Sequence, residues 1–173
     1  MSTNVSALFR SLTYGVYVIG VAHGGRRNAF TAAWVMQAAF DPLLLALSIN
    51  TRHASYPLLR DGRVFSVSVL RQGQLDLARH FGTTSGREVD KLAGYRWRTA
   101  VTGAPILEDA LAYFDCRTSY TCHASDHELI LGHVVDGAIL TPEATPLHYA
   151  GTDDLDGSSA LYPATLDHST GHA

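Results

Sequence analysis

The stretch Asn28–Gln37, NAFTAAWVMQ, decides how this chain folds and where its candidate site lies. It is mostly apolar and contains residues that favour extended backbone, so it predicts a β-strand. Thr31, Ala32 and Ala33 are small, whereas an ordinary half-buried strand favours Val or Ile at such positions. Small side chains let a flat group lie close to a strand. The stretch is therefore either an ordinary core strand or a strand against which a planar ligand lies.

The segments on either side of this stretch predict antiparallel neighbours. Tyr14–Ala22, YGVYVIGVA, is rich in Val and Tyr and is typical of a strand. Gly24 and Gly25 in the following HGGRRN can adopt positive φ, which predicts a turn and a hairpin with Asn28–Gln37. Pro42–Asn50, PLLLALSIN, is a continuous apolar run and predicts a strand buried on both faces.

The rest of the chain combines further strands with short helices. Helices are predicted at 6–12, with Ser6 as the cap, and at 53–62 and 72–82. Strands are predicted at 64–70, 111–122, 128–140 and 146–150, and a polar loop at 83–94. This order lacks the strand–helix–strand rhythm of a parallel sheet, so it favours an antiparallel barrel with a few helices across its openings.

Composition excludes several classes of protein. The length of 173 residues fits one domain, and 46% apolar with 17% charged residues is an ordinary globular balance. A net charge of −3 gives no basic footprint, so we expect no nucleic acid partner. No apolar run approaches the roughly 20 residues of a membrane helix, and the N-terminus lacks the pattern of a signal peptide. We therefore expect no membrane association and a cytoplasmic location.

Cysteine and histidine content predicts neither a disulfide nor a metal site. Cys116 and Cys122 lie on one predicted strand, where a separation of about 20 Å forbids a bond between them. His123 and His127 flank a hairpin tip, but no third metal ligand stands nearby, so a solvated turn is the favoured interpretation. The sequence also lacks a dinucleotide-binding Gly-x-Gly-x-x-Gly and a phosphate-binding loop that ends in Gly-Lys-Ser/Thr.

A series of spaced motifs resembles the flavin reductase-like family of FMN-binding split-barrel proteins. In order they are LTYGVYVIG, NAFTAAWVMQAAFDPLLLALSIN, YPLL, FSVSVL, HFG, DKLAGYRW, GAPILEDALAYFDCR, SDHELILGHVVD and PLHYAG, from about Phe9 to Gly151. TAAWVMQAAFDP most resembles flavoredoxin-like proteins and the flavin reductase domains of flavodiiron proteins.

This resemblance implies a fold and an assembly. The fold is mainly β, a six-stranded antiparallel Greek-key split barrel with short inserted α-helices. The assembly is a homodimer with FMN in a groove at the subunit interface. We expect residues 1–150 to form the FMN-binding domain. Residues 151–173, rich in Gly, Ser and Asp, then form a C-terminal arm that is partly disordered or crosses to the partner subunit.

The resemblance also implies the residues that bind the cofactor. The strand that begins at Asn28 lies along the isoalloxazine ring, and the loop SINTRHAS holds the ribityl phosphate, with Arg52 as its main cation. Arg87 and Lys91 are second candidates, for this phosphate or for a pyridine nucleotide, although a surface loop commonly carries such charges. The complete set is Asn28, Thr31, Ala32, Ala33, Trp34, Ser48, Ile49, Asn50, Thr51, Arg52, Ser55, Phe81, Arg87 and Lys91.

Two aromatic residues of the motifs have competing interpretations. For Trp34 we favour packing in the core over a position in the dimer groove. His127, in SDH, is implied to stand near the nicotinamide side of the flavin and is the candidate catalytic residue. The alternative is that His127 is an ordinary histidine at a hairpin tip.

The implied activity is that of an NAD(P)H:flavin oxidoreductase. FMN is the expected flavin, with FAD as an alternative, and NADH or NADPH is the substrate. Reduced flavin or electrons would pass to a monooxygenase or another electron-transfer partner. Because hydride transfer is chemistry of the flavin, the protein needs no strong acid–base constellation. Two alternatives stay open: an FMN electron carrier with little NAD(P)H activity, and a split-barrel module that binds haem or another ligand.

Overall fold

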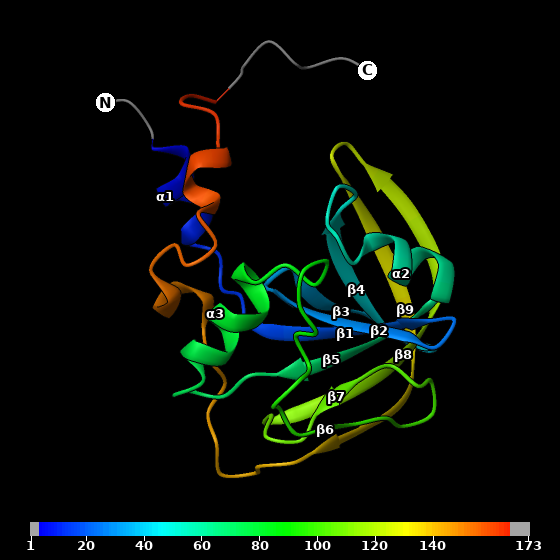
Figure 1. Ribbon diagram of the computed structural model, residues 1–173. Coiled ribbons are helices and arrows are strands. Elements are labelled where there is room, and N and C mark those ends of the chain that lie inside the picture. The colour runs from blue at the N-terminus through cyan, green and yellow to red at the C-terminus, as the bar shows by residue number, and fades with distance from the viewer. Residues whose placement is uncertain (1–3, 167–173) are drawn as a thin grey trace.

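The computed structural model describes residues 4–166 and shows a mainly antiparallel β fold (Figure 1). Seven strands form the main sheet in the order β2-β1-β5-β8-β9-β4-β3. Their bounds are β1 Tyr17–His23, β2 Arg26–Ala32, β3 Val35–Phe40, β4 Leu43–Asn50, β5 Val64–Val69, β8 Ala112–Ala124 and β9 His127–Ile139. Two short strands, β6 Trp97–Arg98 and β7 Ile106–Leu107, form a second sheet.

Short helices accompany the strands, as the sequence predicts. Helix α1 Val5–Arg10 precedes β1, α2 Tyr56–Gly62 and α3 Leu75–Thr83 lie between strands, and the 3-10 turns η1 Tyr149–Thr152 and η2 Ser158–Leu161 follow β9. Pro57 stands in the first turn of α2, where a missing N–H costs no helical hydrogen bond. The cap of α1 is Asn4, whose side chain accepts a hydrogen bond from the Ala7 amide, so the prediction of Ser6 was wrong.

The link between β2 and β3 curls the sheet into a barrel. These strands are the two opposite edges of the sheet, yet only Ala33 and Trp34 separate them along the chain. Three residue steps reach about 10 Å, which is roughly twice the spacing of neighbouring strands. The two edges must therefore meet. Since no ladder joins β2 to β3 in residues 4–166, the barrel stays split at this seam.

The stretch NAFTAAWVMQ is thus two strands, and the prediction of one continuous strand was wrong. The Val35 amide donates to the Ala33 carbonyl over 3.0 Å, a γ-turn that breaks the extended backbone. The Trp34 carbonyl then accepts from the Ser48 amide, also over 3.0 Å, which begins the pairing with β4. This break raises the main sheet from six strands to seven and confirms the split-barrel class.

Two apolar clusters hold the barrel. One fills its interior and contains fully buried Ile19, Leu47 and Phe65. The other lies outside the sheet beneath α3 and includes Ala78 and Phe81, both without exposed surface. Removing apolar surface of this kind from water is the main favourable term for folding, about 25 cal/mol per Å².

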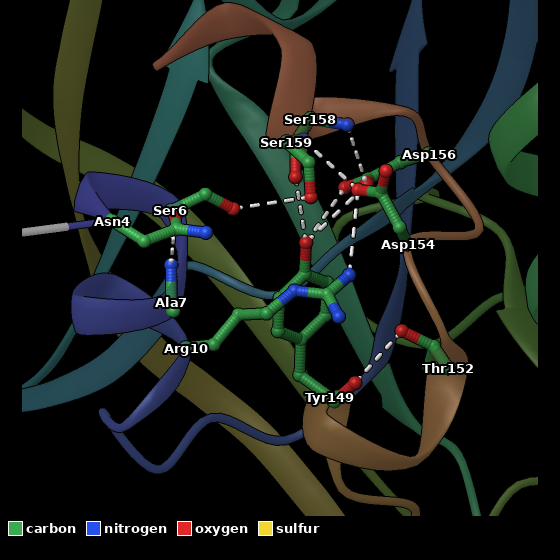
Figure 2. A network of polar contacts seen from close by, with 10 residues as sticks. All are labelled: Asn4, Ser6, Ala7, Arg10, Tyr149, Thr152, Asp154, Asp156, Ser158 and Ser159. Carbon is green, nitrogen blue, oxygen red and sulfur yellow. Dashed lines mark hydrogen bonds and ion pairs between the residues drawn. The ribbon is translucent and has the colours of Figure 1, made fainter. Parts of the chain in front are cut away.

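The N-terminal helix and the C-terminal segment pack together beside the barrel (Figures 1 and 2). Arg10 forms an ion pair with Asp154 at 3.4 Å, and the Phe9 ring stacks on Tyr162 at 5.3 Å. Ser6 donates to Ser159, as Figure 2 shows. The strand predicted at 146–150 was wrong: two isolated bridges and η1 occupy this segment. Residues 1–3 and the end of the predicted arm, 167–173, lie outside the described residues.

Candidate functional site

The candidate site lies where the seam between β2 and β3 meets the tip of the β8–β9 hairpin. The rings of Trp34 and His127 lie 5.0 Å apart, and Asn50 on β4 pairs with His127 on β9. Trp34 is 41% exposed, so our preference for a position in the core was wrong. The γ-turn at Ala33 interrupts the alternation of side chains between the two faces of the strand. The Trp34 ring therefore lies at the exposed edge of the seam between β2 and β3.

His127 is held in a defined state by its neighbour. Its Nδ1 lies 2.8 Å from Oδ1 of Asp126, and its side chain is only 21% exposed. The hydrogen bond from His127 lowers the pKa of Asp126, so this carboxylate is charged and accepts from Nδ1. Nε2 is therefore the ring nitrogen that can interact with a ligand.

The loop after β4 is tied to the same hairpin tip. The Thr51 amide donates to the Asp126 carbonyl over 3.3 Å, and Oδ1 of Asn50 accepts from the Arg52 amide over 2.9 Å. The Arg52 side chain is exposed. These bonds hold the predicted phosphate loop and His127 at one end of the barrel.

A buried pair connects this loop to β2. Nδ2 of Asn28 donates to Oγ of Ser55 over 3.0 Å, and Oδ1 of Asn28 accepts from the Ala29 amide over 2.8 Å. Asn28 is 8% exposed and Ser55 is fully buried. Gly86 packs so closely on Asn28 that a Cβ there would lie 2.3 Å from Nδ2. The loop after α3 therefore covers this pair, and only glycine fits at the contact.

His53 is a neutral donor beside this pair, which the sequence did not predict. Its Nδ1 accepts from the Ser55 amide over 3.2 Å, and its ring lies 4.5 Å from Phe30. Burial, reinforced by the charges of Lys91 and Arg87, lowers the pKa of His53 to about 4. At neutral pH its single proton is therefore on Nε2, which can donate to an anion.

Lys91 is a buried cation without a carboxylate partner. It is 3% exposed, and Nζ donates to the Phe81 carbonyl over 2.7 Å. Burial lowers the pKa of Lys91 to about 8. No acidic side chain of residues 4–166 forms an ion pair with it. Together with Arg87 it makes the local potential positive, and a bound anion would compensate that charge.

The structure brings most of the predicted residues to one region. Thr31, Ala32 and Ala33 are partly exposed, and Oγ1 of Thr31 donates to the Ala78 carbonyl over 2.7 Å. Ile49 and Phe81 are exceptions, because their side chains are 3% and 0% exposed and belong to the core. Residues 4–166 contain no group of three or more potential metal ligands.

A sequence model of the flavin reductase like domain matches residues 9–154. The chain belongs to the flavin reductase like family. Its split barrel is the fold of flavin-binding oxidoreductases, as the resemblance in the sequence implied. Within residues 4–166 no helix is long and apolar enough to cross a membrane.

The relatives of this chain include a rubredoxin and a diflavin flavoprotein. High molecular weight rubredoxin of Moorella thermoacetica is 38% identical over 142 residues, which are 81% of this chain and 62% of that protein. The chain spans only 24% of Diflavin flavoprotein A 1 of Synechocystis sp.. The chain therefore spans less than two thirds of the length of each of these two relatives.

Solved structures agree with the family. The NADH:FAD oxidoreductase SgcE6 of Streptomyces globisporus matches with a TM-score of 0.79 and 25% identity, over 86% of this chain and 88% of that chain. The FMN-binding protein of Thermus thermophilus, solved with p-hydroxybenzaldehyde, matches with a TM-score of 0.70 and 34% identity, over 75% and 73%.

The buried charge of Lys91 makes folding stability depend on pH. Between about pH 8 and the ordinary lysine pKa of 10.5, the folded chain has lost a proton that the unfolded chain keeps, so stability rises with pH in this window. We expect Lys91→Met to remove this rise. The free energy of unfolding by urea, measured from pH 7 to pH 10.5 for both proteins, tests it. If the free energies of unfolding of wild type and Lys91→Met differ by the same amount at every pH, burial of a charged Lys91 is contradicted.

Proposed function

We propose that this chain binds FMN and acts as an NAD(P)H:flavin oxidoreductase. The observation that carries the proposal is the pair of cations Lys91 and Arg87 around the neutral donor His53, which form no ion pair with a carboxylate of residues 4–166 and lie beside the partly exposed small residues of β2. The phosphate of a flavin nucleotide would supply the negative charge that neutralises these cations. The small residues supply the flat surface that its ring needs.

The phosphate and the ring would bind to different elements. Arg52, His53 and Ser55 belong to the loop between β4 and α2, and Arg87 and Lys91 approach from the loop after α3. These residues would hold the phosphate. Thr31 and Ala32 end β2 at the seam, and Ala33 follows them in the link to β3. These three small residues would lie along the ring. The hydrogen bond between Asn28 and Ser55 joins the two parts and fixes their separation.

Trp34 and His127 would form the wall on the nicotinamide side. When bound, the flavin supplies the hydride chemistry, and the protein orients the reactants and excludes water. Because Nδ1–H donates to Asp126, a neutral His127 presents Nε2 as a hydrogen-bond acceptor. In its imidazolium form Nε2 can donate a hydrogen bond to a group that gains negative charge. The NADH:FAD oxidoreductase among the structural matches supports a nicotinamide donor with FAD as an alternative flavin, and the FMN-binding protein supports FMN.

An exposed apolar face supports a homodimer. Met36 and Tyr120 are 66% and 68% exposed, and they share one row of the sheet with Ala46 and Leu131. Leu129, 38% exposed, lies in the next row beside Ser48. Apolar surface of this extent typically marks an interface. The face borders Trp34 and His127, so a second copy seated on it would complete the flavin groove.

Anaerobic reduction separates the oxidoreductase from an electron carrier. We expect the protein reconstituted with FMN to lose its visible flavin absorbance when NADH or NADPH is added. His127→Gln should slow this reduction at least about tenfold, which is about 1.4 kcal/mol of transition-state stabilisation, with FMN affinity unchanged. His123→Gln, on the same hairpin but exposed, is the matched control and should react at the wild-type rate.

Other outcomes would refute parts of this proposal. Bound FMN that is reduced by dithionite but by neither nicotinamide would make the chain a carrier. A protein that takes up no flavin but binds haem would defeat both flavin functions.

The apolar face makes a separate prediction about assembly. We expect wild type to sediment at about twice the chain mass of 18.7 kDa and Met36→Glu to sediment as a monomer, because a buried unpaired carboxylate is costly. The monomer should also bind FMN more weakly. Val101→Glu, which changes another exposed apolar residue, should stay dimeric. A wild-type monomer that binds FMN tightly would rule out the shared groove.

A further inference from the structure

Five exposed arginines gather at the end of the barrel where α2 terminates. We call this surface the basic end: Arg26 and Arg27 at the start of β2, Arg60 and Arg63 at the end of α2, and Arg117 on β8. In Figure 1 the blue β1–β2 turn lies beside the end of α2. None of these residues belongs to the predicted flavin site.

Close backbone contacts bring these elements together. Gly62 packs against β1 so tightly that a Cβ would lie 1.9 Å from the Ala22 carbonyl oxygen. The Thr118 amide donates to the Arg63 carbonyl over 2.9 Å, and Arg117 pairs with Val64. The basic end is therefore a fixed feature of the fold, because each arginine extends from backbone that is locked to its neighbour.

The charge of the basic end is opposite to that of the chain. It holds five of the 13 Lys and Arg residues, while the whole chain has 16 acidic residues and a net charge of −3. Asp61 lies next to Arg60 and pairs with it at 2.7 Å, and Glu128 adds negative charge near Arg60. Outside the five arginines and Asp61 the chain has eight basic and 15 acidic residues, so the basic end gives the molecule a dipole. Such a dipole steers an oppositely charged partner toward one end.

Two of these arginines are held in place by neutral groups. Nε of Arg27 donates to the Gly103 carbonyl over 3.3 Å, and its guanidinium lies 5.7 Å from the centre of the Trp97 ring. Nη2 of Arg63 donates to the Thr118 carbonyl over 3.1 Å. These contacts order the side chains and leave their positive charge uncompensated. Arg26, Arg27, Gly62 and Gly103 also line a pocket of about 300 Å³.

We propose that the basic end is a docking surface for a protein partner with an acidic face. Exposed charges spread over several elements fit a macromolecular surface better than a small anion, which needs buried, convergent donors. A nucleic acid strand would extend past the basic end and meet the acidic remainder of the molecule. A compact acidic protein needs to touch only this end, and arginine forms bidentate contacts with its carboxylates.

The position of the basic end connects docking to the predicted flavin site. α2 begins next to Ser55, which bonds to Asn28, and ends at Gly62 in the basic end. Seven helical residues span about 10 Å, so a docked partner would lie one short helix away from the phosphate loop. The docking proposal does not require bound flavin.

Titration with a fluorescent octaglutamate peptide tests the proposal. We expect binding at low salt that weakens at least about fivefold at physiological ionic strength, where charges are screened beyond about 8 Å. The double variant Arg26→Glu and Arg63→Glu should lower the affinity at least tenfold. The matched control, Arg71→Glu with Arg79→Glu, changes the net charge equally at the opposite end of β5 and on α3, and should bind like wild type.

Several outcomes would overturn the proposal. No binding of octaglutamate by wild type, or equal loss in both double variants, would show that the basic end is not a specific surface. An oligonucleotide of equal charge that binds as tightly as the peptide would instead indicate nucleic acid. Thermal unfolding of each variant verifies that the fold is retained. FMN affinity is measured in parallel, so failure of docking is distinguished from failure of the flavin site.

Discussion

The fold depends on a connection of two residues between the opposite edges of one sheet. Ala33 and Trp34 link β2 to β3, and because so short a link reaches only about 10 Å, the sheet must close on itself. The same link interrupts the strand, so that Trp34 leaves the core and meets His127. The same two-residue link, with its γ-turn, therefore closes the barrel and places Trp34 beside His127.

Electrostatics at this end of the barrel favours ligand binding at a cost to stability. Lys91 is buried without an acidic partner, and burial opposes its charge. A chain selected for stability alone would place an apolar residue there, since buried charges rarely repay their desolvation. An anionic cofactor would supply the missing counter-charge, and whatever binds the folded state also stabilises it. The arginines of the basic end differ from Lys91, because they stay exposed to water and keep most of their solvation free energy.

Much of this structure could be predicted from the sequence. Val-rich runs and the Gly24–Gly25 turn gave the strands and hairpins, because local propensity and burial agree there. The motifs predicted the split barrel, which the structure confirms, and the phosphate loop that they imply stays a prediction. The strand break at Ala33 was missed, because nothing in NAFTAAWVMQ shows that pairing changes from β1 to β4 within it. Trp34 was misplaced for the same reason.

The electrostatic details of the site could not be predicted either. The role of His53 depends on Ser55, Phe30 and Lys91, which reach it from separate segments. The only hint was its place in the polar run SINTRHAS. Gly86 likewise gave no signal, because its closeness to Asn28 arises only after the loop following α3 folds over β2.

We propose that a flavin nucleotide binds with its phosphate on the residues of the two loops, Arg52, His53 and Ser55 after β4 and Arg87 and Lys91 after α3. Comparing the affinities of FMN and riboflavin tests it most directly, because the two ligands differ only by the phosphate. We predict that wild type binds FMN at least tenfold more tightly than riboflavin. Arg52→Gln should weaken FMN and leave riboflavin unchanged. Equal affinity of wild type for the two ligands would contradict the account.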